Sequence, residues 1–325
     1  MRIHPADING MVGIVPTPAS PDGDKWSTVD SLNLPETEKM IRIVVDAGID
    51  IVLTNGTFGE CATLTADEHI TFTACVAQTI AGRVPFFAGV GTLNTRDTIT
   101  RSKALLAAGA DGLFIGRPMW LAMTQQQIVE FHRDLAEAMP GVPQIVYDNP
   151  VAFKGKIDQD AYIALAKIPE VVAAKHVGGP ALDSDVAAVG DSLRILPVND
   201  HWLDAARKQP DLVTAAWSGH TACAPAPLVA LAKAIAARDW DDAARITARC
   251  SWATEAMMVG GDLAAFMNYS IPIGHLRFAA AGLIDPGPTR PPYTSLPDSY
   301  REGGTETGRR WAVVQREFVG ETVAA

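Results

Sequence analysis

The chain has 325 residues, of which 48% are hydrophobic and 20% charged, and its net charge is -10. An acidic chain without a basic run is a poor binder of nucleic acid, and no window of eighteen apolar residues without charges predicts a membrane span. The first five residues lack the apolar core of a signal peptide. We therefore expect a cytoplasmic protein, with neither nucleic acid nor a membrane as its partner.

Metal and redox signatures are absent from the sequence. The seven histidines form no H-E-x-x-H array, and no pair of cysteines has metal or redox spacing. Reduced thiols in the cytoplasm are the simplest interpretation of such cysteines. The four are Cys61, Cys75, Cys223 and Cys250. We expect no metal and no organic cofactor.

Apolar segments alternate with helical patterns along the first 220 residues. Continuous apolar runs are typical of strands buried on both faces of a parallel sheet. The predicted strands are 11–16, 49–53, 84–90, 111–115, 144–147, 171–175, 193–198 and 212–217. The predicted helices are 30–47, a helix after the capping box of Thr65 and Glu68, 95–109, 128–139, 158–167, 181–189 and 201–208. Eight such units indicate a (β/α)8 TIM barrel, with a doubly wound sheet as the second choice.

The rest of the chain is predicted to be helical. Residues 227–238 complete the barrel, and further helices are expected at 240–258, 262–281 and 308–318. No linker is long or polar enough to separate these helices as an independent domain. The expected organisation is a barrel over 1–238 and a helical appendage over 239–325, packed on the barrel.

Lys175 ends the apolar segment 171–175 and precedes a glycine turn at Gly178-Gly179. A buried ammonium group is costly, and the cost falls when the amine loses its proton and becomes a nucleophile. The alternative is a lysine at a strand end whose amine reaches water.

Two other strand ends carry candidate groups. Gly56-Thr57-Phe58-Gly59-Glu60 follows the second strand, and its glycines let backbone N–H groups approach an anion near a helix N-terminus. Tyr147 ends the fifth strand, where a phenol can transfer protons. Together with Lys175 these groups suit a 2-keto acid, whose ketone meets the amine and whose carboxylate meets the turn. Alone, each would be an ordinary turn or a structural tyrosine.

These motifs resemble the dihydrodipicolinate synthase and N-acetylneuraminate lyase family of Schiff-base pyruvate aldolases. Gly56 to Glu60 matches the family's G-T-T-G-E, Tyr147 to Pro150 matches Y-N-x-P, and Lys175 matches the Schiff-base lysine. The resemblance implies that Lys175 and Tyr147 are catalytic. Phe58 and Ala152 depart from the synthase pattern, as does the absence of a tyrosine pair after the fourth strand. These departures argue against dihydrodipicolinate synthesis.

The hydratase-aldolases of naphthalene and phenanthrene degradation are the more similar branch. The shared motifs are G-T-F-G-E-C-A-T-L-T at 56–65, P-M-W at 118–120, N-P-x-A-F-K at 149–154, Trp217-Ser218 and R-P-P-Y at 290–293. The resemblance implies cleavage of an arylidene-pyruvate into pyruvate and an aromatic aldehyde by a homotetramer. The expected substrate-binding residues are Gly56, Thr57, Phe58, Trp120, Asn149, His176, Trp217, Ser218 and Ser270.

The ring substituent is expected to be an ortho-carboxylate, as in trans-2'-carboxybenzalpyruvate. The members that handle a hydroxyl have asparagine at the position of Ser270 and tyrosine at that of His176. A serine leaves room for a larger group, and His176 and His220 are candidate donors to a carboxylate. The alternatives are an ortho-hydroxyl substrate that gives salicylaldehyde, a sugar-acid lyase, a metal-dependent aldolase, and a non-catalytic barrel that binds a keto acid.

Overall fold

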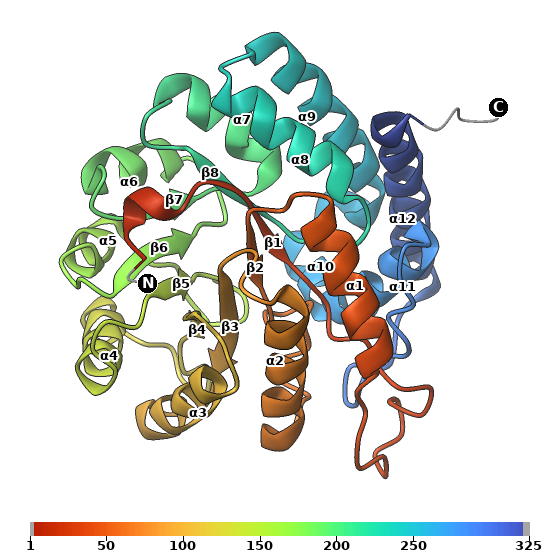
Figure 1. The fold of residues 1–325 in the computed structure, drawn as a ribbon, viewed down its shortest axis with the longest axis horizontal. Helices are drawn as coiled ribbons and strands as arrows, with labels where there is room; N and C mark the ends of the chain where they lie inside the picture. Colours follow the sequence, from red (N-terminus) through yellow and green to blue (C-terminus); the bar gives the residue numbers. More distant parts are fainter. Residues whose placement is uncertain (1–2, 321–325) are drawn as a thin grey trace.

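The computed structural model describes residues 3–320, in which eight parallel strands form a nearly closed barrel. Strand β1 pairs with both β2 and β8, and a bridge between Val198 and Trp217 joins the end of β7 to β8. Helices surround the strands, and the last helices, α10 to α12, lie together at one side (Figure 1). The predicted (β/α)8 barrel is confirmed.

The strands agree closely with the predicted segments. Two of them, at 144–147 and 171–175, have the predicted bounds. The strands are β1 (Gly10–Ile14), β2 (Ile51–Leu53), β3 (Phe86–Gly91), β4 (Gly112–Gly116), β5 (Gln144–Tyr147), β6 (Val171–Lys175), β7 (Arg194–Leu196) and β8 (Ala215–Ser218).

The barrel helices follow the strands in the expected order. Helix α1 begins four residues later than predicted, because the side chain of Asn33 accepts a hydrogen bond from Glu36 N and caps it there. The capping box of Thr65 and Glu68 is confirmed at the start of α2. These helices are α1 (Leu34–Asp46), α2 (Ala66–Ile80), α3 (Thr95–Ala107), α4 (Gln125–Ala138), α5 (Gln159–Leu165), α6 (Leu182–Val189), α7 (Asn199–Lys208) and α8 (Pro225–Ala236).

Alternation along each strand divides the apolar side chains between two layers. In β5, Ile145 and Tyr147 belong to the cluster inside the barrel, while Val146 packs in the layer between the sheet and the helices. Tyr147 is therefore directed into the barrel.

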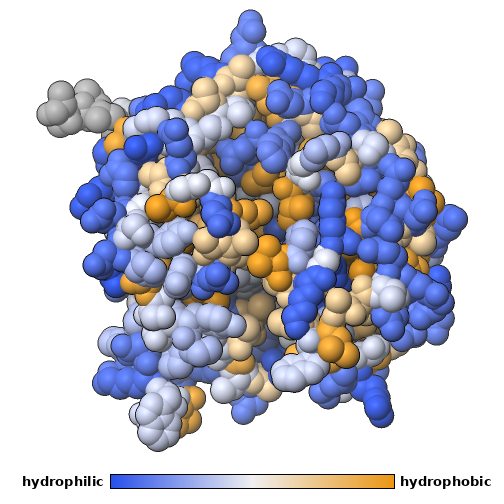
Figure 2. Space-filling view, turned by 180° about the vertical axis from the view of Figure 1, so that it is seen from behind, coloured by the Kyte–Doolittle hydropathy of each residue, from blue (hydrophilic) through white to orange (hydrophobic). Residues whose placement is uncertain are grey.

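On the face turned away in Figure 1, apolar side chains gather towards the centre and polar ones cover most of the periphery (Figure 2).

The C-terminal helices differ from the prediction in two places. The segment 262–281 is broken at Tyr269, and the last helix begins ten residues earlier than expected. The start was not predicted because glycine at Gly308 weakens the local helix signal. In the structure a Cβ at this position would lie 2.7 Å from Ala280 Cβ, so the glycine lets α12 pack closely on α11. The helices are α9 (Trp240–Thr254), α10 (Leu263–Asn268), α11 (Ser270–Ala281) and α12 (Asp298–Val319).

The expected division at 238 falls between α8 and α9. The domains 1–238 and 239–325 stay a prediction, and residues 1–2 and 321–325 of them lie outside the described part of the chain. Within residues 3–320, no helix combines the length and the apolar character that a membrane span requires.

Candidate active site

Lys175 ends β6 with its side chain enclosed by aromatic rings. The side chain is 5% exposed, and its Nζ lies 3.7 Å from the ring centroid of Trp217 and 4.9 Å from that of Tyr147. Desolvation lowers the pKa of Lys175 from 10.5 to about 7, although the charge of Asp148 opposes this shift. A large share of the amine is therefore neutral near pH 7 and is available as a nucleophile.

Asp148, which opposes that shift, is itself paired. Its Oδ1 accepts a hydrogen bond of 3.1 Å from Arg117, and both side chains are buried. The Arg117 guanidinium lies 5.1 Å from the ring centroid of Phe153, which in turn packs edge-on against Tyr147. The arginine partly offsets the effect of Asp148 on Lys175, because it places a positive charge beside the carboxylate.

Tyr147 lies in a three-residue hydrogen-bond network. Its hydroxyl oxygen accepts from Thr57 N at 3.3 Å and from Asn149 Nδ2 at 3.3 Å, and it lies 2.7 Å from Thr57 Oγ1. With two donors already directed at the oxygen, the phenolic hydrogen is free to donate to Thr57 Oγ1. Burial raises the pKa of Tyr147, so the phenol is neutral and can supply a proton.

The turn that holds Thr57 is conformationally constrained at both ends. Asn55 and Glu60 have φ values of 49° and 54°, in the left-handed region that non-glycine residues rarely adopt. A Cβ on Gly59 would lie 2.7 Å from Asn55 N, so this close turn requires glycine. The helix expected to follow the turn is α2, which begins at Ala66 after the cap Thr65, so five residues separate its first turn from Glu60.

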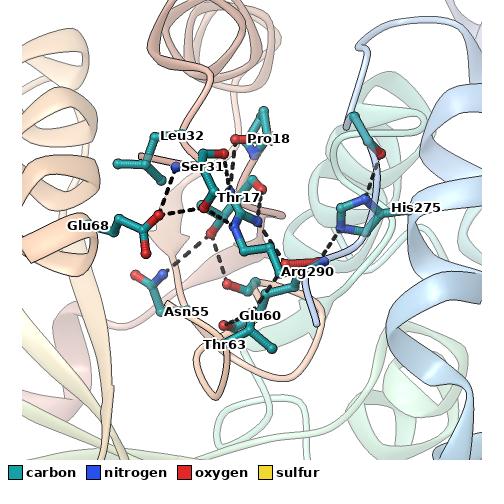
Figure 3. Close-up of polar contacts among 12 residues, drawn as sticks. Thr17, Pro18, Ser31, Leu32, Asn55, Glu60, Thr63, Glu68, His275 and Arg290 are labelled. Atoms are coloured by element: carbon teal, nitrogen blue, oxygen red, sulfur yellow. Dashed lines mark hydrogen bonds and ion pairs between the residues drawn. The ribbon is translucent and has the colours of Figure 1, made fainter. Parts of the chain in front are cut away.

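The rear of the turn is fixed by an ion-pair network around Glu60 and Arg290 (Figure 3). Arg290 NH1 donates to Glu60 Oε2 at 2.7 Å, and His275 Nε2 lies 3.1 Å from Glu60 Oε1. Burial alone would raise the pKa of Glu60, but His275 and Arg290 together hold it below its ordinary value. The other acceptors of the Arg290 guanidinium are Thr17 O, Pro18 O, Ser31 O and Ser31 Oγ. The network ties the C-terminal segment to the turn.

Comparison with known proteins places this pocket in a family. A model described as "Dihydrodipicolinate synthetase family" matches residues 10–304. The chain belongs to the dihydrodipicolinate synthetase family. Within this family, the chain is 49% identical over 318 residues to the trans-2'-carboxybenzalpyruvate hydratase-aldolase of Nocardioides sp. (strain KP7), covering 97% of this chain and 96% of that protein.

Two further relatives are similar over nearly their whole length. The trans-O-hydroxybenzylidenepyruvate hydratase-aldolase of Pseudomonas aeruginosa is 37% identical over 324 residues, covering 98% of this chain and 97% of that protein. A solved structure described as PhdJ bound to a substrate intermediate superposes with a TM-score of 0.96 at 50% identity, covering 98% of this chain and 99% of that chain. The predicted resemblance to the dihydrodipicolinate synthase family and its hydratase-aldolase branch is confirmed.

The structure brings several of the predicted residues together around Lys175. Thr57, Tyr147 and Asn149 share the network described above, and Trp217 lies against the amine. The indole Nε1 of Trp217 donates to the carbonyl of His176 at 2.9 Å, which fixes the ring. Gly56 opens the turn beside Tyr147, since a Cβ there would lie 3.7 Å from the phenolic oxygen.

Other predicted residues occupy less direct positions in this dihydrodipicolinate synthetase family member. The Trp120 side chain is 74% exposed and lines a groove of about 510 Å³ beside α4. Ser218 accepts a hydrogen bond from His220 N, and Ser270 donates to Met267 O. The Phe58 ring packs 4.3 Å from the guanidinium of Arg277. Contact of these side chains with a substrate stays a prediction.

The two histidines expected to donate to a carboxylate have partners within the chain. His176 Nε2 lies 3.1 Å from Asp185 Oδ2, and its Nδ1 accepts from Gly178 N at 2.9 Å. His220 Nδ1 lies 3.2 Å from Arg277 NH1, and burial followed by the charge of Arg277 holds the pKa of His220 well below 6.5. Both ring nitrogens of His176 thus have partners within the chain, and its contact with a substrate carboxylate stays a prediction. Within residues 3–320, no three His, Cys, Asp or Glu side chains gather as a metal site.

Sequence reasoning missed the ion pairs and the buried Arg277. Glu60 and Arg290 both stood inside recognised motifs, but nothing in the sequence paired residues so far apart. Arg277 had a readable signal, because it is the one basic side chain other than histidine in the apolar helix α11. A fixed charge in such a segment indicates a specific electrostatic role.

Proposed function

We propose that this protein is a class I hydratase-aldolase that cleaves an arylidene-pyruvate to pyruvate and an aromatic aldehyde. The observation that carries the proposal is the amine of Lys175, which has a pKa of about 7 and lies beside the hydroxyl network of Tyr147. The hydratase-aldolases named above support the substrate class, because each matches almost the whole chain.

The proposed reaction begins with the neutral amine. Lys175 adds to the C2 ketone, and loss of water gives an iminium conjugated to the alkene. Water adds at the benzylic carbon, the electrons move into an enamine, and protonation at C3 restores the iminium. A water molecule, or the neutral phenol of Tyr147 acting as a relay that releases its own proton as it accepts this one, then removes the proton of the new hydroxyl, and the C3–C4 bond breaks. Aldehyde leaves, and protonation and hydrolysis of the remaining enamine release pyruvate and Lys175. No step uses a metal or an organic cofactor.

The covalent step can be tested by reductive trapping. Borohydride added with pyruvate should leave an adduct on Lys175, which peptide mass spectrometry locates. An adduct on Lys154 or Lys156 would overturn the assignment, and the absence of any adduct would favour a barrel that only binds keto acids. A chelator-sensitive reaction would favour a metal-dependent aldolase.

We infer that the preferred ring substituent is an ortho-carboxylate, which would make the products 2-carboxybenzaldehyde and pyruvate. The higher identity to the carboxybenzalpyruvate enzyme, 49% against 37%, supports this choice, as does the small Ser270. The test compares kcat/KM for 2-carboxybenzalpyruvate and 2-hydroxybenzalpyruvate. A tenfold preference for the hydroxy compound, about 1.4 kcal/mol in transition-state binding, would instead assign salicylaldehyde formation.

We also propose a cytoplasmic homotetramer that functions in aromatic hydrocarbon breakdown, with phenanthrene as the parent compound. Leu93, Trp120 and Leu121 are 60%, 74% and 74% exposed in the single chain, and such an apolar group is suited to an interface between copies. The four cysteines are free, which suits a reducing compartment. Light scattering after gel filtration tests the assembly, and a monomeric mass would contradict it.

A further inference from the structure

Arg277 is a fully buried cation whose hydrogen-bond partners are all uncharged. The side chain is 0% exposed, and NH2 donates to Gly219 O at 2.8 Å. NH1 lies 3.2 Å from His220 Nδ1 and 3.6 Å from Met257 Sδ, while Nε has no partner among the described residues. Desolvation lowers the pKa of Arg277 to about 10, so the group still carries its charge at neutral pH.

The other two arginines near the pocket are neutralised. Arg117 pairs with Asp148, and Arg290 pairs with Glu60. None of the ion pairs within residues 3–320 includes Arg277. A buried charge without a counter-charge is costly, so an anion that arrives near it is favoured.

Arg277 contacts two segments that border the pocket, the turn at 56–60 and the residue after β8. Its guanidinium stacks on the ring of Phe58, whose backbone belongs to the turn expected to hold the keto acid carboxylate. It also bonds to Gly219, which directly follows the last residue of β8. A Cβ on Gly219 would lie 3.1 Å from the Phe58 ring, so glycine leaves the space that this ring occupies. Arg277, Phe58 and Gly219 therefore form one packed unit behind the turn.

We propose that Arg277 is the counter-charge for the carboxylate of the 2-keto acid and selects anionic substrates through the Phe58 turn. The inference rests on the proposed function, because it needs a keto acid at Lys175. The side chain has no exposed surface, so it is a positioning residue that acts by its field and by holding the ring. The interior between the cation and the turn screens charge poorly, so the interaction extends beyond direct contact.

The test compares a ketone that has a carboxylate with one that does not. Borohydride trapping on Lys175 is measured with pyruvate and with methyl pyruvate, for the wild type and for Arg277→Met, Arg277→Gln and Arg277→Lys. The two neutral variants should reduce the preference for pyruvate over methyl pyruvate about tenfold, the effect of losing one poorly screened charge interaction. Arg277→Lys should retain part of the preference, between the wild type and the neutral variants, because burial lowers the pKa of a lysine whereas arginine stays charged.

Three outcomes would overturn the proposal. These are an unchanged preference in both neutral variants, an equal loss of trapping for both ketones, and a loss of preference in Arg277→Lys that exceeds the loss in Arg277→Met. Because removal of a buried charge can prevent folding, thermal melting is recorded for each variant, and Arg277→Lys against the wild type gives a second comparison. Calorimetric binding of pyruvate and methyl pyruvate gives the same ratio without trapping. A wild type that binds pyruvate but forms no adduct would contradict the proposed chemistry alone.

Discussion

Two of the buried ionisable side chains of the candidate site, Lys175 and Glu60, have surroundings that are opposite in kind. Lys175 is 5% exposed and faces the rings of Trp217 and Tyr147. Glu60 is 0% exposed and faces Arg290 and His275. The pKa of the lysine falls towards neutrality, whereas the carboxylate is held in its charged form. The carboxylate behind the turn is thus paired directly with Arg290 and His275, whereas the negative charge that acts on the amine, Asp148, is itself paired with Arg117.

The largest effect is expected from the amine itself. Lys175→Met should reduce turnover by about 10⁶-fold, the scale seen when a covalent nucleophile is removed. The measurement is steady-state release of pyruvate, with Lys103→Met, at an exposed position of α3, as the matched control. Turnover of Lys175→Met within tenfold of the wild type would remove the amine from the mechanism.

The phenol next to the amine should matter less than the amine. Tyr147→Phe should reduce kcat by about 10²- to 10⁴-fold, because proton transfer by a positioned group contributes that much. The pyruvate adduct on Lys175 should still form, at a lower rate. Tyr293→Phe, at a half-exposed tyrosine, is the control, and near wild-type turnover of Tyr147→Phe would contradict the assignment.

Removal of a partner of Glu60 should affect the stability of the fold more directly than the chemistry. Arg290→Met leaves Glu60 buried without its arginine partner and should lower the free energy of unfolding by about 3–5 kcal/mol. The control is Arg42→Met, which removes an exposed pair with Glu38 and should cost less than about 1 kcal/mol. Urea unfolding measures both. Similar losses in the two variants would mean that the Glu60 network contributes no more than a surface pair.

The smallest expected effect is a pH dependence of the free energy of unfolding, which distinguishes Lys175 from the ion-paired Glu60. The folded pKa of Lys175, about 7, lies below its unfolded value of 10.5, so the unfolded chain binds more protons between these values and wild-type stability rises with pH there. Lys175→Met lacks this dependence. Its stability advantage should be about 4 kcal/mol at pH 7 and about 2 kcal/mol at pH 9. An advantage that stays constant from pH 7 to pH 9 would contradict the low pKa.

Much of the fold could be predicted because it depends on local patterns. The runs 145–147 and 171–174 are continuous and apolar, so both strands were predicted correctly, and with them Tyr147 and Lys175 at the ends that open to the pocket. The start of α12 was not found, because Gly303, Gly304 and Gly308 weaken the local helix signal and serve packing against neighbouring segments instead.

Site residues could be predicted where their chemistry depends on the residue type and its burial alone. They could not be predicted where their role depends on contacts that form only in the folded chain. Lys175 needs only burial to become a nucleophile, and burial could be read from its strand. The partners of His176, Asp185 and Gly178, could not be predicted from the sequence. The pairing of Glu60 with Arg290 depends on the folded chain, because 230 positions separate the two residues.

The span of the Arg290 bonds has a consequence for synthesis on the ribosome. The guanidinium bonds to Thr17 O across 273 positions, so the turn at 56–60 receives its final support only after nearly the whole chain has emerged. The barrel strands appear earlier and can pair while translation continues, since domains generally form from the N-terminus onwards. A nascent chain stopped before residue 290 would therefore assemble strands without a finished pocket, and catalytic competence would be acquired in the last step of folding.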